Sequence, residues 1–83
     1  PSEGDTAWAH GWLGEHEQRL FDRMAAVDRS HSIGVARAVL AHLDRVGLDA
    51  DDPDARWIAA AALLHDVGKT VAGLGTYGRV IAT

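Results

Sequence analysis

The sequence predicts an all-α fold for one small domain. Apolar residues recur three and four positions apart over most of the chain, which is the period of one face of a helix. The longest apolar run, residues 57–64, is too rich in alanine and too poor in β-branched residues for a buried strand. A chain of 83 residues has room for a single domain and no more.

The first part of the chain predicts two short helices with a joint near Gly14. Asp5 or Thr6 is the expected N-cap of the first helix. Gly11 and Gly14 weaken the helical pattern, which strengthens again from Glu15. Four large side chains of this part are expected to pack in the core: Trp8, Trp12, Phe21 and Met24.

A longer helix is expected over residues 30–46, after a connection over residues 25–29. Asp28 or Ser30 is the expected cap, and Gly47 is the stop signal. The apolar positions fall three and four apart and predict the buried face: Ile33, Val35, Ala36, Val39, Leu40, Leu43 and Val46.

The last complete helix is expected over residues 55–67 and should be buried centrally, because residues 58–64 are apolar all round. The polar turn before it carries four aspartates but lacks the central glycine and terminal glutamate of an EF-hand loop. We therefore interpret the turn as solvated, with Asp52 or Asp54 capping the helix. Gly68 should end this helix, and Val80 to Ala82 resemble the start of another.

Composition excludes several classes of function. The chain has no cysteine, so it has no disulfide and no thiolate metal site. A net charge of −4 argues against non-specific nucleic-acid binding, but a bound metal ion would still permit a small phosphorylated substrate. No apolar run approaches the roughly 20 residues of a membrane span, and we recognise no secretory signal. We therefore expect a cytoplasmic protein without membrane contact.

His31, His65 and Asp66 form the one constellation that predicts chemistry. His65 and Asp66 end the most apolar helix, where a charged carboxylate is costly to bury without compensation. His31 should lie in the first turn of the preceding helix, and a short loop brings that turn near the end of the next helix. Imidazole and carboxylate bind divalent metals. Spacing alone leaves other pairings open: the aspartate with Lys69 or Arg29, and the histidine with a helix-end carbonyl.

Two segments resemble the HD superfamily of metal-dependent phosphohydrolases. The stretch AALLHDVGK at residues 61–69 is similar to the family's His-Asp signature, and HSIGVAR at residues 31–37 is similar to its first-ligand helix. The resemblance covers about residues 28–70. It implies a helical bundle in which His31, His65 and Asp66 bind a divalent ion such as Mn, Fe, Zn, Mg or Ni.

The same resemblance implies hydrolysis of a phosphate ester or anhydride, with a nucleotide among the candidates. The metal would activate a water, Asp66 would take part in catalysis, and Lys69 would hold the substrate phosphate. Arg37 and Arg79 are weaker candidates of the same kind. The GLGTYG stretch at residues 73–78 matches a dinucleotide fingerprint in letters only, because it follows a helix rather than a strand.

The chain departs from the family pattern after Asp66. The family ends with a further metal-binding aspartate, but no Asp, Glu or His follows Asp66 here, and the GYP triplet of one subclass is absent. We therefore expect residues 1–83 to form one partial HD-type domain with a helical extension at residues 5–24. The alternative is a catalytically inactive HD-like module for ligand binding, regulation or oligomerisation. An uncovered apolar face would favour a homo-oligomer.

Overall fold

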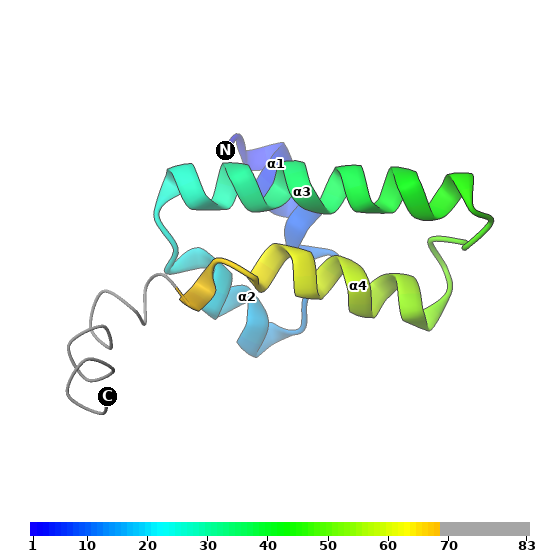
Figure 1. The fold of residues 1–83 in the computed structure, drawn as a ribbon. Coiled ribbons are helices and arrows are strands. Elements are labelled where there is room, and N and C mark those ends of the chain that lie inside the picture. Colours follow the sequence, from blue (N-terminus) through cyan, green and yellow to red (C-terminus); the bar gives the residue numbers. More distant parts are fainter. Residues whose placement is uncertain (69–83) are drawn as a thin grey trace, which may run out of the picture.

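Four helices form two layers in the computed structural model, which describes residues 1–68. α1 (Glu3–His10) and α2 (Glu15–Asp22) are short, whereas α3 (Ala26–Arg45) and α4 (Pro53–Leu64) are long. α3 and α4 run side by side in opposite directions, and the two short helices lie behind them (Figure 1). The described residues contain no strand, which confirms the predicted all-α class.

The joint between the first two helices lies where the glycines predicted it. α1 ends at His10, and Gly14 is the N-cap of α2, with Glu17 accepting a hydrogen bond from the Gly14 backbone N–H. The predicted cap of α1 was wrong. Ser2 is the N-cap, and Asp5 is its partner three residues later in a capping box, so each side chain binds the other's backbone N–H.

α3 begins at Ala26, four residues earlier than predicted. Its N-cap is Ala25, whose side chain accepts no hydrogen bond, so the expected caps Asp28 and Ser30 lie inside the helix. The predicted stop at Gly47 is confirmed. Gly47 has a φ of 89°, and the backbone N–H groups of Gly47 and Leu48 bind the carbonyls of Asp44 and Leu43, the pattern of a Schellman motif.

α4 begins at Pro53 and is capped by Asp52, one of the two predicted caps. The prediction of central burial was wrong. Only Ala55, Ala59 and Leu63 are buried, while Trp57 is 76% exposed. The small side chains on the inner face let α4 pack closely on α3, and the outer face of α4 has no cover among the described residues.

The core lies between the two layers. Phe21 and Met24 are buried as predicted, and Trp8 and Trp12 pack against the core while partly exposed. Of the apolar positions on α3, Ile33 and Ala36 are buried, others are half-buried, and Val46 is 64% exposed, contrary to prediction. The remaining buried core residues come from α1, the following turn and α4: Ala9, Leu13 and Leu63.

No described helix has both the length and the apolar character needed to cross a membrane. The helix expected from Val80 and the glycine-rich stretch at residues 73–78 lie outside the described residues.

Candidate metal centre

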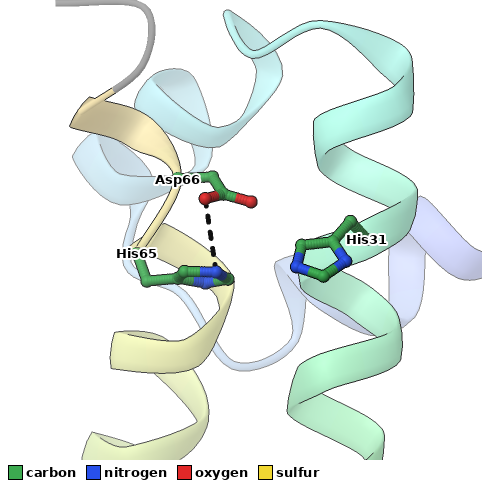
Figure 2. A group of neighbouring side chains, drawn as sticks. All are labelled: His31, His65 and Asp66. Carbon is green, nitrogen blue, oxygen red and sulfur yellow. Dashed lines mark ion pairs between the residues drawn. The ribbon is translucent and has the colours of Figure 1, made fainter. Parts of the chain in front are cut away.

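The three predicted ligands meet at one end of the α3–α4 pair. His31 extends from α3, and His65 and Asp66 lie in the turn that follows α4 (Figure 2). One ligand atom from each residue lies within 4.8 Å of the other two. His31 is in the second turn of its helix rather than the first, because α3 begins at Ala26. The proximity inferred from the antiparallel helix pair is confirmed.

The His65 ring is held in one orientation by its own helix. Its Nδ1 lies 2.6 Å from the carbonyl oxygen of Ala62. A carbonyl oxygen can only accept, so Nδ1 carries the proton of this hydrogen bond. In the neutral ring, Nε2 then keeps its lone pair, which is the form that coordinates a metal ion.

Nε2 of His65 and Oδ1 of Asp66 are 3.3 Å apart. Because Nδ1 of His65 donates its proton to Ala62, the neutral ring has only a lone pair at Nε2. That lone pair faces a lone pair of the Asp66 carboxylate, and the two repel each other. A cation shared by the two atoms removes this repulsion. The local geometry therefore favours positive charge at this point.

The site combines one buried and two accessible side chains. Asp66 is 7% exposed, whereas His31 and His65 are both exposed, and their ring centroids are 5.7 Å apart. A carboxylate at this depth is costly unless positive charge or hydrogen bonds compensate it. The imidazoles face solvent, so a small molecule can reach the site from their side.

The donor set suits a divalent ion. Two imidazole nitrogens and one carboxylate oxygen form a mixed set that Zn, Mn and Fe accept, and three protein ligands leave coordination positions for water or substrate. The separation of at most 4.8 Å between donor atoms lets all three approach a common ion after small side-chain rotations. The residues present therefore fit a metal ion.

Comparison with known families agrees with this geometry. The model of the HD domain matches residues 29–79, which is more than half of the chain. The chain belongs to the HD-domain family. The matched segment contains all three candidate ligands of this HD domain and begins after α1 and α2. No curated protein and no solved structure shows significant similarity.

The other candidate residues of this HD domain lie elsewhere or outside the described part. Lys69 and Arg79 are outside the described residues. Arg37 donates to Asp5 at 3.0 Å and stacks over Trp8, which ties α3 to α1. Arg29, considered as a partner of the aspartate, donates to the carbonyls of Asp22 and Met24 and so holds the end of α2.

The remaining histidines lie apart from the candidate centre. His10 binds Asp22, with 2.7 Å between Nε2 and Oδ1, and His16 and His42 are exposed. Among residues 1–68, His31, His65 and Asp66 are the only group of three or more His, Asp or Glu side chains whose ligand atoms are close enough to share an ion.

Two features near the ligands complete the site: the first was an open alternative from the sequence, and the second was not predicted. The open alternative of a histidine bound to a helix-end carbonyl and the metal hypothesis turn out to be compatible, since Ala62 occupies only Nδ1 of His65. Ser32, beside His31, is fully buried, and its Oγ has no hydrogen-bond partner among the described residues. The sequence gives no signal for the second feature, because a serine in a helix is usually exposed.

Proposed function

We propose that this HD-domain chain is a metal-dependent phosphohydrolase that acts on a small phosphate ester or anhydride in the cytoplasm. The observation that carries the proposal is the convergence of His31, His65 and Asp66 from two helices on one point. Membership of the HD-domain family supports it. A nucleotide is one substrate within this class.

In this proposal the ring nitrogens of the two histidines and the carboxylate of Asp66 hold the ion. When bound, a divalent ion supplies positive charge that polarises a phosphoryl oxygen and lowers the pKa of a coordinated water. The Ala62 carbonyl keeps the lone pair of His65 Nε2 directed at the site. The exposed imidazole side admits the substrate, and the buried Asp66 anchors the opposite side.

Charge balance explains why the site needs a cation. The chain has a net charge of −4, and a phosphate substrate is itself an anion. The ion and the ammonium of Lys69, three residues after Asp66, would supply attraction for the phosphate. Lys69 is proposed as the phosphate contact, and Asp66 as the group closest to the reacting atoms.

One observation favours the alternative of a binding module without turnover. None of the residues after Asp66 is an Asp, Glu or His, so no fourth protein ligand of these types follows in this sequence. Such a module would hold the metal or a phosphorylated ligand without hydrolysing it.

Hydrolysis assays separate these two functions. The chain would be loaded with Mn²⁺ or Zn²⁺ and assayed with p-nitrophenyl phosphate and with nucleoside mono-, di- and triphosphates. We expect turnover that falls at least about 100-fold in Asp66→Asn, because a metal ligand is lost while the side-chain shape is kept.

The control is His42→Gln, which changes an exposed histidine of the same helix as His31 and should leave the rate unchanged. Metal binding without turnover of any substrate would support the binding module. Equal activity in Asp66→Asn and the unaltered chain would contradict the proposed site.

A further inference from the structure

The outward side of α4 carries an apolar stripe that the described fold leaves uncovered. Trp57, Ala61 and Leu64 follow one another at spacings of four and three residues and so share one side of the helix. Trp57 is 76% exposed and Ala61 is exposed, whereas Leu64 is half-buried because part of it packs against the core. A tryptophan exposed to this extent is unusual on a monomer and typical of a contact surface.

A hollow of about 240 Å³ lies along this stripe. Trp12, from the turn after α1, forms another part of its lining. Ala61 and Trp57 also line the hollow, and Trp57 is nevertheless 76% exposed. One surface therefore carries both an exposed apolar side chain, Trp57, and a hollow lined largely by apolar residues.

The hollow is also lined by one acidic and one basic residue, Glu17 and Arg56. Glu17 uses Oε1 to accept from the Gly14 backbone, which leaves its other oxygen for a second donor. Arg56 is exposed, and its side chain has no ion pair or hydrogen bond within the described part of the chain. The surface thus offers both signs of charge together with an apolar centre.

We propose that this surface binds a second copy of the same chain in a two-fold dimer. We call it the Trp57 face, defined by Trp12, Glu17, Arg56, Trp57, Ala61 and Leu64. A two-fold contact brings a surface against itself, so it needs complementary features on the same patch. The Trp57 face meets this need: Trp57 packs in the partner's hollow, and Arg56 pairs with the partner's Glu17.

The charge arrangement allows a test with complementary variants. In Arg56→Glu and in Glu17→Lys, each homodimer would carry two like-charge contacts. We expect each to associate about tenfold more weakly than the unaltered chain in a sedimentation-velocity dilution series. An equimolar mixture of the two variants restores both opposite-charge pairs, so the mixed dimer should recover most of the lost affinity.

Trp57→Ala tests the apolar part of the same contact. We expect its dissociation constant to rise at least about 30-fold, because two tryptophans per dimer lose their partner surface. Val27→Ala is the control, since Val27 is 74% exposed and lies outside the Trp57 face. Far-UV circular dichroism of each variant checks that the helices remain formed, which separates lost association from lost folding.

Two outcomes would overturn the proposal. One is an unaltered chain that sediments as a monomer at every concentration. In that case the fluorescence of Trp57 would be obtained as the difference between the unaltered chain and Trp57→Phe. Blue-shifted Trp57 emission from the monomer would show that the chain's own residues 69–83 cover the Trp57 face instead. The other is a dimer whose affinity is unchanged by both charge reversals and by Trp57→Ala, which would place the contact elsewhere.

Discussion

Asp5 is the side chain with the clearest electrostatic role. It accepts a hydrogen bond from the Ser2 backbone within the capping box and another from Arg37, whose guanidinium also stacks 4.7 Å from the centre of the Trp8 ring. The Ser2 side chain and backbone N–H, and then the Arg37 guanidinium, hold the pKa of the Asp5 carboxyl below its ordinary value of 3.8. Asp5 therefore ties α1 to α3 most strongly in its ionised form.

This pKa shift predicts how stability depends on pH. The folded-state pKa is lower than the unfolded-state value of 3.8, so folding favours the ionised carboxyl. The contribution of Asp5 is complete above the unfolded value and is lost as the pH falls through the folded value. We expect Asp5→Asn to lower the urea midpoint at about pH 6, with the difference from the unaltered chain shrinking below about pH 4.

Asp49→Asn is the matched control, because Asp49 is an exposed aspartate in the turn between α3 and α4. Its urea midpoint should follow that of the unaltered chain over the same pH range. A difference for Asp5→Asn that grows as the pH falls would contradict the assigned direction of the pKa shift.

At the same scale, the sequence predicted the candidate ligands but left open whether a backbone carbonyl binds the histidine. His31, His65 and Asp66 could be found because an ionisable pair at the end of an apolar run needs a compensating charge, and antiparallel helices bring His31 near it. The backbone carbonyl that fixes the His65 ring belongs to Ala62, whose identity carries no such information. Backbone acceptors are supplied by the fold and not by residue type.

Among the elements, α4 has a start that is fixed by a side-chain cap and a proline. The Asp52 side chain accepts a hydrogen bond of 2.8 Å from the Asp54 backbone N–H, and Pro53 opens the helix with a fixed φ. We expect Asp52→Ala to lower the free energy of unfolding by about 1 kcal/mol, because one backbone donor at the helix start loses its partner.

Urea unfolding followed by circular dichroism would measure this effect. The neighbouring Asp51→Ala is the control, since Asp51 is exposed and does not cap α4. Equal losses in the two variants would show that the charge of the turn, rather than the cap, stabilises α4.

Helix starts and faces were predicted with unequal success, for physical reasons. Gly47 was identified correctly, and Asp52 was one of two predicted caps, because a positive φ and a capping carboxylate each require particular residues. α3 gave no such signal, since Ala25 caps it without a side-chain hydrogen bond. For α4, apolar residues on all sides of the helix predicted burial on all sides. Only its inner face packs against α3, so Trp57 stays exposed.

In the molecule as a whole, the core positions the candidate centre. Leu63 is fully buried two residues before His65, and Ile33 is buried two residues after His31. Packing in the common core therefore fixes the two backbone segments from which the ligands extend. The fold class and the helix order could be predicted from periodicity, whereas the two-layer arrangement depends on side-chain packing that a pattern does not contain.

The metal content of the purified chain tests the central claim most directly. The unaltered chain, His65→Ala, Asp66→Asn and the control His42→Ala would each be loaded with Mn²⁺ or Zn²⁺, desalted and measured by elemental analysis. The structure predicts close to one ion per chain in the unaltered protein and in His42→Ala, and a large loss in the two ligand variants. An unaltered chain that retains no metal, or ligand variants that retain as much as it does, would contradict the proposed centre.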